Sequence, residues 1–433
     1  MSFNKSILIN SFSVRYIFLL ISVFINIYVL SQPNKRTNNW FFSDSISIDF
    51  NSGEPVIGYP GPIDTIAWGS TSIMSDTVGN LLFYSDGFYV YNKNHEKMQN
   101  SWAGPDYVHG AQSALCMPKP GSVNLFYVFT ANIFQLPDNQ PLNFYHTLDM
   151  SLNNGLGGIV KTDTLPFAWD ASEQLGASYF KDKSGYWIIM RKYREHKYAA
   201  WKVTSQGVDP DPILSDAPNR YFTSGSANTG YMKISYDKKY IIYIYTFGNS
   251  YYADIEICKF NNDTGIIEFL YSFKLKDLYS ETYKTLNGEF SPDSKYFYVA
   301  GFISADNVSH IYQFDMQYVE DEDSFTQSAI MVGGPIGFNM QLASNGKIYC
   351  FSEMDNGPED NIISVINKPG KPGLECDYQP NILAISYGEI HMPFVNLATD
   401  FLYRFDFDGI CESDTFTFDP WFFPEPVSIQ WNF

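Results

Sequence analysis

Positively charged residues are scarce in this chain of 433 residues. Lysine and arginine together number 28, against 47 aspartate and glutamate residues, and the formal net charge is −19. Nucleic acids and anionic membrane surfaces both require a basic footprint on the proteins that bind them. We therefore expect no nucleic-acid partner and no electrostatic docking on anionic lipid, and we interpret the acidic surface as a source of solubility.

Cysteine is also sparse, and it never occurs as a Cys-X-X-Cys pair. The five cysteines are Cys116, Cys258, Cys350, Cys376 and Cys411. Their spacing argues against a zinc site, and it leaves the disulfide pairing unassigned. An odd number leaves at least one thiol unpaired in an exported chain. Cys350 lies in an apolar run, so we expect it to be a small buried side chain.

The chain has no sustained helical periodicity, and only residues 274–283 could form a short helical turn. No apolar run after residue 31 is long enough to span a bilayer. Aromatic residues are abundant instead: they make up 18% of the chain, with 32 Tyr and 36 Phe, whereas charged residues make up 17%. Aromatic rings pack well on pleated surfaces, so this composition favours β-strands.

Residues 1–31 are predicted to be an N-terminal signal peptide. Lys5 and Arg15 precede the apolar run Tyr16–Leu30, and Ser31 completes an acceptable small-residue cleavage site. Cleavage would release the remainder as a soluble protein, secreted or held at the outer-membrane surface. The alternative is an uncleaved membrane anchor, although the run is shorter than the ~20 residues that a span needs.

One phrase recurs along the chain: a turn rich in Asp, Asn, Ser and Gly, followed by an apolar run of strand-forming residues. In the clearest copy, the turn Ser291–Lys295 precedes the run Tyr296–Val299, and Gly301 follows. The runs of the other copies are Leu81–Tyr84, Leu125–Phe129, Tyr186–Met190, Tyr240–Ile244 and Ile348–Phe351. Successive copies lie roughly 45–60 residues apart, the period of propeller blades.

A second strand follows most copies, and we expect it to pair antiparallel with the first. These second strands are Phe88–Tyr91, Tyr198–Trp201, Ile255–Cys258, Ile311–Phe314 and Ile362–Ile366. Antiparallel repeats of this kind hide their edges by closing into a ring. The pattern predicts an all-β fold, a WD40/YVTN-like β-propeller of about seven blades over residues 32–404. We expect the strand Trp40–Phe50 to complete the blade of the last repeat, near Ile382–Ile385 and Phe394–Leu397.

The repeated pattern of a polar turn and an apolar run ends before Phe401, and a different pattern follows. Phe405–Gly409 is predicted to be a turn, and Cys411–Phe418 and Val427–Phe433 are predicted to be strands, with prolines between them. Two strands cannot cover a sandwich core. We therefore expect residues 405–433 either to pack on the ring or to begin an immunoglobulin-like domain in a fragment of a longer protein.

Many short phrases of this chain follow one family pattern across roughly residues 38–400. They are Ser85–Gly87 with Asn92–His95, Gln112–Ala114 with Pro118–Gly121, Asp149–Leu152 with Asn154–Gly157, Phe290–Asp293, Tyr312–Asp315, Gln341–Ala343 with Gly346–Tyr349, and Val365–Asn367. In these phrases the chain resembles the N-terminal β-propeller region of Bacteroidota surface proteins that carry a type IX secretion (type B) or gliding-motility-associated sorting domain. The tail resembles the opening of a truncated PKD-type domain, without the usual Gly-Asp turn or a sorting domain. The resemblance implies a surface role and transfers no catalytic residue.

Carboxylates are the main candidates for chemistry, because glycoside hydrolysis needs two of them across the substrate. The candidates are Asp76, Asp86, Glu173, Asp237, Glu289, Asp293 and Glu389. Asp76, Asp237 and Asp293 lie in the repeated turn, where an aspartate is expected to bond its own backbone. Glu173 and Glu289 stand in apolar surroundings, and a functional role for them stays open.

Other candidate sites are weaker. The six histidines are His95, His109, His146, His196, His310 and His391; none has metal-ligand spacing, and structural imidazoles are expected. Calcium is a modest option at the acidic run Glu320–Asp323 or at Asp406–Gly409, although neither has EF-hand spacing. No Gly-X-Ser-X-Gly elbow is present, and the Gly-rich stretch Asn154–Gly158 reads as a loop.

The sequence therefore favours a secreted or cell-surface binding or scaffold propeller without enzymatic activity, in adhesion or gliding motility. We predict no catalytic, cofactor-binding or metal-binding residue. We expect a monomer that binds a glycan or a surface protein. The alternative is a polysaccharide hydrolase or lyase that uses the propeller channel. In either case function is expected in the long loops Trp102–His109, Asn132–Asn143 and Ser205–Asn228.

Overall fold

Strands dominate the computed structural model of the chain. It describes residues 35–42, 46–58, 70–101, 111–131, 143–166, 171–192, 195–218, 229–246, 253–275, 287–303, 308–336, 339–352, 362–384, 395–401, 404–408 and 417–421. The helical elements described are α3 (Glu322–Gln327) and the 3-10 segments η2 (Asn153–Gly155), η3 (Met316–Tyr318), η4 (Gly373–Cys376) and η5 (Thr399–Phe401). No described helix is long and apolar enough to cross a membrane. The predicted signal peptide lies outside the described ranges.

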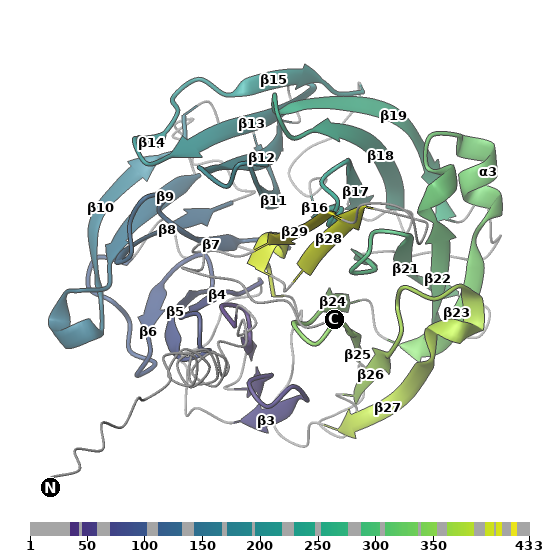
Figure 1. Cartoon of the computed structure of the whole chain (residues 1–433), viewed down its shortest axis with the longest axis horizontal. Coiled ribbons are helices and arrows are strands. Elements are labelled where there is room, and N and C mark those ends of the chain that lie inside the picture. The colour runs from purple at the N-terminus through teal and green to yellow at the C-terminus, as the bar shows by residue number, and fades with distance from the viewer. Residues whose placement is uncertain are drawn as a thin grey trace, which may run out of the picture.

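Seven antiparallel sheets stand around a common axis and form the blades of a β-propeller (Figure 1). Blade 1 is β1 (Asn39–Phe42), β2 (Ile46–Asp49) and β3 (Val56–Gly58). Blade 2 is β4 (Ser72–Ser75), β5 (Leu81–Ser85) and β6 (Val90–Asn92). Blade 3 is β7 (Ala114–Pro118), β8 (Leu125–Thr130), β9 (Phe144–Asp149) and β10 (Gly158–Thr164). Blade 4 is β11 (Ala171–Tyr179), β12 (Tyr186–Lys192), β13 (Lys197–Thr204) and β14 (Gly207–Val208), and β15 (Ile213–Asp216) also pairs with β13.

The remaining three blades have four strands each. Blade 5 is β16 (Thr229–Ile234), β17 (Tyr240–Thr246), β18 (Ala253–Asn261) and β19 (Ile266–Lys274). Blade 6 is β20 (Gly288–Phe290), β21 (Tyr296–Ile303), β22 (Val308–Asp315) and β23 (Ile330–Ile336). Blade 7 is β24 (Asn339–Leu342), β25 (Ile348–Ser352), β26 (Ile362–Ile366) and β27 (Tyr378–Ala384). The first strand of each blade lies toward the axis and the last lies at the rim, so the predicted seven-bladed propeller is confirmed (Figure 1).

The repeated turn joins the first strand of a blade to its second. In blade 6 the Ser291 hydroxyl donates to the Asp293 carboxylate at 2.7 Å and accepts from the Tyr296 main-chain N–H at 2.9 Å. Ser294 has a φ of +58°, a left-handed conformation that closes the turn. The following run is buried along its length, from Phe297 to Ala300. The phrase is therefore the ring's structural unit, as its repetition predicts.

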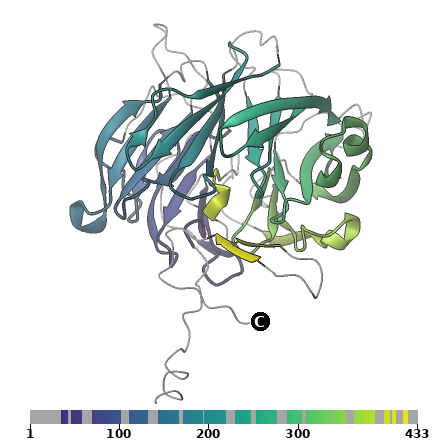
Figure 2. The same ribbon diagram turned by 45° about the horizontal axis from the view of Figure 1, so that its top comes forward.

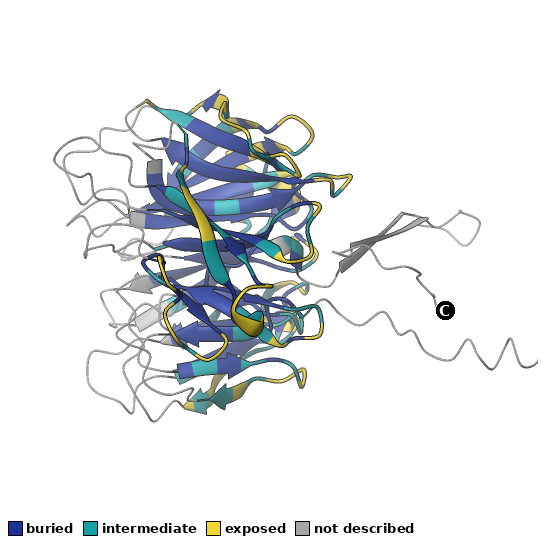
Figure 3. Ribbon diagram, turned by 90° about the vertical axis from the view of Figure 1, so that its left-hand side faces the viewer, coloured by how far each residue is buried: buried dark blue, intermediate teal, exposed yellow. Residues whose placement is uncertain are grey.

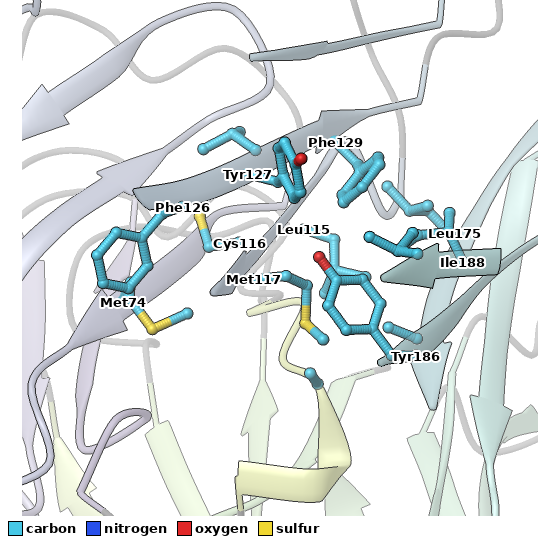
Figure 4. Close-up of a cluster of buried hydrophobic side chains, with 14 of the residues drawn as sticks. Met74, Leu115, Cys116, Met117, Phe126, Tyr127, Phe129, Leu175, Tyr186 and Ile188 are labelled. Atoms are coloured by element: carbon cyan, nitrogen blue, oxygen red, sulfur yellow. The ribbon is translucent and has the colours of Figure 1, made fainter. Parts of the chain in front are cut away.

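Apolar side chains between neighbouring sheets form the core. The blades are buried along most of their strands and exposed at their turns (Figure 3). Figure 4 shows one cluster in which Met74 of blade 2, Leu115 and Phe126 of blade 3, and Tyr186 of blade 4 lie together. The sheets pack face to face around the ring (Figure 2). Four cysteines, Cys116, Cys258, Cys350 and Cys376, are buried, and Cys350 is the small core residue predicted.

The ring closes in a way that the sequence did not predict. The segment Trp40–Phe50 does not complete the last blade, because it folds as the hairpin β1–β2 of a separate blade 1. Blade 7 already has four strands of its own and needs none from blade 1. Packing closes the seam instead: Trp40 lies 6.2 Å from the rings of both Tyr349 and Phe351, measured between ring centroids.

The segment after blade 7 also departs from expectation. Val395 forms a parallel bridge with Thr71 just before β4, so residues 395–397 lie on the axis rather than in a blade. Beyond it, β28 (Arg404–Asp408) pairs with β29 (Thr417–Trp421). The predicted turn at Phe405–Gly409 is thus a strand through Asp408, because its alternating Phe and Asp suit a strand better than a turn. The predicted strands fall largely or wholly outside the described residues.

Candidate functional site

The inner strand of blade 4 carries a polar bulge next to the axis. Ala171 pairs with Lys192 and Leu175 pairs with Met190, so the intervening residues Ser172, Glu173 and Gln174 bulge out of the ladder. Their side chains are at most 2% exposed. Bulges redirect side chains and are common near functional sites. The bulge therefore makes the axis the first candidate for a functional site.

Glu173 connects three blades through its carboxylate. Its Oε2 accepts the main-chain N–H of Ala111, ahead of β7, at 2.8 Å, and its Oε1 accepts that of Gly230 on β16 at 2.6 Å. Burial raises the pKa of Glu173 to about 8, and the two N–H groups oppose that rise. The carboxyl group therefore joins inner strands that do not share a ladder.

Glu289 has the same role on the opposite arc of the ring. Its Oε2 accepts from the Lys233 ammonium at 2.9 Å and from the Leu342 main-chain N–H at 3.0 Å. Its Oε1 accepts from the main-chain N–H of Phe290 at 2.9 Å. Lys233 also donates to Oε1 of Gln341 at 2.9 Å. Blades 5, 6 and 7 are thus joined by a buried, charge-balanced network.

Gln112 bridges across the axis from blade 3 to blade 5. Its Oε1 accepts from the Met232 main-chain N–H at 2.8 Å, and its Nε2 donates to the Met232 carbonyl at 3.1 Å. The side chain therefore satisfies both backbone groups of one residue, as a neighbouring strand would. We call Gln112, Glu173, Lys233, Glu289 and Gln341 the axial belt.

Two side chains of the bulge differ from the belt. The hydroxyl of Ser172 and both amide atoms of Gln174 are buried and have no hydrogen-bond partner within the described part of the chain. A buried polar group without a partner costs about 1–3 kcal/mol. The bulge is therefore less satisfied than the belt beside it.

The turn aspartates behave as the sequence predicts. Asp76 accepts the main-chain N–H groups of Val78 and Asn80, at 3.0 and 2.9 Å. Asp237 and Asp293 each accept from a serine hydroxyl two residues earlier. Asp86 is buried and accepts from Phe88 and Tyr89 N–H groups, while burial raises its pKa. Glu389 lies outside the described residues.

The four described histidines lie in different parts of the ring. His146 is buried on β9, where its Nδ1 lies 2.7 Å from the Thr162 hydroxyl and burial lowers its pKa to about 4. His95 lies 3.3 Å from the Tyr84 hydroxyl. His196 lies just before β13 and His310 lies on β22, whereas His109 and His391 fall outside the described ranges. Among described residues, no three His, Cys, Asp or Glu side chains are grouped as metal ligands.

The acidic run Glu320–Asp323, a calcium option in the sequence, leads into a helix. Asp321 is the N-cap of α3 and accepts the Ser324 main-chain N–H at 2.8 Å. Glu322 and Asp323 occupy the first turn, where the helix dipole favours negative charge. Glu320 pairs with Lys259 at 2.8 Å. Capping and ion pairing therefore account for these carboxylates, and Asp406–Asp408 lie on β28.

Sequence reasoning found the two glutamates of the belt and missed its other members. Gln112 and Gln341 lie in the family phrases, but a neutral amide carries no chemical signature by itself. Both lie just before or within the first strand of a blade, and this position is the signal that could have predicted their place at the axis. The expected functional loops lie mostly outside the described residues; only 143 and 205–218 of those ranges are described.

The comparisons with known proteins give likenesses of structure alone. No protein-family model and no curated protein matches the chain. Three similar solved structures are the periplasmic gluconolactonase of Pseudomonas aeruginosa (10% identity, TM-score 0.45, covering 81% of this chain and 95% of that one), the Dos1 propeller (13%, 0.40, 74% and 77%) and the β-propeller domain of the Trilobed protease from Pyrococcus furiosus (9%, 0.32, 63% and 71%). At these values the likenesses carry no argument about activity. The class of this protein, a seven-bladed β-propeller, rests on its own sheets.

Proposed function

We propose that this chain is an exported propeller that binds or scaffolds other molecules without catalysing a reaction, with a glycan or a surface protein as its partner. One observation carries the proposal: the acidic groups of the axial belt are engaged by the ring itself. Both oxygens of Glu173 accept main-chain N–H groups, and both oxygens of Glu289 accept from Lys233 or the main chain. Groups used in this way hold blades together and are not presented to a substrate.

The expected export and surface role support the same proposal. The apolar run Tyr16–Leu30 after Lys5 and Arg15 has the composition of a signal peptide. The family phrases resemble Bacteroidota surface propellers, which suggests a role in adhesion or gliding. Under this proposal residues 405–433 begin a PKD-like domain.

A second candidate, polysaccharide cleavage, is favoured by a separate observation. Glu173 has a pKa raised to about 8, as a general acid requires, and it lies between the partnerless side chains Ser172 and Gln174. Glycoside hydrolysis needs a second carboxylate facing the first. Glu289 is held by a lysine and main-chain donors, which disfavours that role.

The test is a glycan-array screen of the full chain combined with an assay for newly formed reducing ends. We expect retention on a glycan or on a cell-surface fraction, with no product release. Release of product from any glycan, lost in a Glu173→Gln variant, would replace the binding proposal with the hydrolase. Glu268→Gln, an exposed site on β19, is the matched control.

A further inference from the structure

The segment Val395–Phe401, which we call the strap, crosses the axis of the ring. It follows blade 7 in sequence, yet its first contacts are with blade 2. Asn396 donates its main-chain N–H to the Thr71 carbonyl at 2.7 Å, and the Ser72 hydroxyl donates to the Asn396 carbonyl at 2.7 Å. These bonds extend a parallel bridge between Val395 and Thr71. The strap is thus bound in an extended form at the inner edge of β4.

The side chain of Asn396 then reaches two further blades. Its Nδ2 donates to the carbonyls of Ala114 on β7 and Leu175 on β11, at 2.9 and 3.0 Å. Its Oδ1 accepts from Nε2 of Gln112 at 3.1 Å. Both polar main-chain groups of Asn396 and both ends of its side-chain amide are therefore matched. No other amino acid of this size presents a donor and an acceptor in that arrangement.

A second anchor lies four residues later. Asp400 forms an ion pair with Lys238, which is buried in the turn before β17. The carboxylate also accepts the Tyr179 main-chain N–H at 3.0 Å. Phe401 is 1% exposed, and its ring lies 5.9 Å from that of Tyr179. A buried charge with a single cationic partner and a single N–H donor is a specific contact, because an amide could not replace the charge.

The apolar residues of the strap fill gaps in two cores. Val395 and Leu397 pack with the blade 1 and blade 7 residues around Trp40, and Ala398 and Phe401 pack with blades 2 to 4. The strap nevertheless belongs to no sheet of the ring. Every blade is formed without it. In this respect the strap resembles a ligand bound to a site and differs from a strand, which is part of its blade.

We propose that the axis of this propeller is a recognition site for a short peptide, extended at its start and ending in a 3-10 turn, and that the strap is the peptide that occupies it. The pattern recognised is an asparagine, three residues of which the first is apolar and the second small, and then aspartate and phenylalanine. A peptide with this pattern, supplied by a second copy of the chain or by another protein, competes for the same contacts. The inference concerns a peptide partner, so it does not depend on whether the protein also binds a glycan, as the proposed function allows.

The experiment separates the strap from the ring without removing it. A protease recognition site is placed between Ala384 and Val395 of the full chain, which is then cut after folding. We expect the C-terminal fragment to co-elute with the ring on size exclusion, and an excess of the synthetic peptide of residues 395–401 to displace it. The same peptide carrying Asn396→Ala and Asp400→Asn should compete at least about tenfold more weakly, which corresponds to about 1.4 kcal/mol, since the two changes remove buried polar and charged partners.

Two further variants complete the test. The cut chain with Asn396→Ala and Asp400→Asn should release its fragment, whereas a cut chain with the exposed change Asp263→Asn should retain it. Near-ultraviolet circular dichroism reports whether the ring stays folded. The proposal is overturned by spontaneous loss of the unaltered fragment, by unfolding of the ring on cutting, or by equal competition from the two peptides.

Discussion

The ammonium of Lys233 on β16 lies 2.9 Å from the carboxylate of Glu289 on β20, and both side chains are buried. The two residues belong to neighbouring blades whose inner strands form no common sheet. A polar contact at the axis thus replaces the ladder that strands would otherwise share.

Breaking this pair from one side should destabilise the ring strongly. Lys233→Met leaves the Glu289 charge buried with neutral donors, namely two main-chain N–H groups and the Tyr236 hydroxyl at 3.3 Å. We expect the free energy of unfolding to fall by about 3–5 kcal/mol. The double variant Lys233→Met with Glu289→Gln should lose less than the sum of the single changes. Urea denaturation of the four proteins measures the coupling, and strict additivity would contradict a direct pair.

The stability of the ring should fall as pH rises through the range set by Glu173. The ordinary pKa of a glutamate is 4.5, and in the folded ring it is raised to about 8. Between these values the folded state keeps a proton that the unfolded state has lost, so the free energy of unfolding decreases with pH and levels off above about 8. The decrease should be a few kcal/mol at most.

The variant Glu173→Gln isolates this effect from all other titrations. Denaturation at pH 5 and at pH 8.5 should show a smaller loss of stability for Glu173→Gln than for the unaltered chain. Glu268→Gln, at the exposed rim, should follow the unaltered chain. Parallel pH profiles for all three would show that Glu173 titrates normally.

Gln174 should be removable without loss of stability, unlike Gln112. Both amide atoms of Gln174 lack partners in the described part of the ring, so Gln174→Leu should leave the free energy of unfolding unchanged or raise it by about 1 kcal/mol. Gln112 makes three hydrogen bonds, and Gln112→Leu should cost about 2 kcal/mol or more. Thermal and urea denaturation compare the two; a large loss for Gln174→Leu would reveal a partner for its amide.

The seam between blades 1 and 7 should depend on packing and little on charge. Trp40 is fully buried against Tyr349 and Phe351, and Trp40→Ala should cost about 3–5 kcal/mol. Lys347 pairs with Glu54 across the same seam at 3.0 Å, but that pair is partly exposed, so Lys347→Ala should cost less than about 1 kcal/mol. Equal costs would assign the closure to the ion pair.

The blades could be predicted from sequence because their signals are local. The turn Ser291–Lys295 and its following apolar run contain, within a few residues, the groups that bond each other. The axis could not be predicted in the same way. Gln112 and Asn396 are 284 positions apart, and neither has a charge or a spacing that marks it. Glu173 and Glu289 were recognised only because a carboxylate in apolar surroundings is unusual. Both partners found for Glu173 are main-chain groups, which every residue carries, and Lys233 lies 56 positions before Glu289.

The prediction that Trp40–Phe50 completes the last blade was wrong for a related reason. Phe42 and Ile46 are separated by a gap too short to stand out in a pattern of alternating residues, so two strands read as one. Nothing local in Trp40–Phe50 distinguishes a strand that completes a distant blade from a hairpin that begins its own. That choice depends on whether blade 7 has a vacant edge, and β27 fills it.

The strap also determines how the ring responds to force. Whatever follows Phe401 in the chain is tethered through the axis rather than through a strand at the rim. A pull from that side loads the bonds to β4, β7 and β11 and the Lys238 ion pair, which belong to several blades. We expect the tether to resist extension until the contacts of the strap break together, and then to fail abruptly.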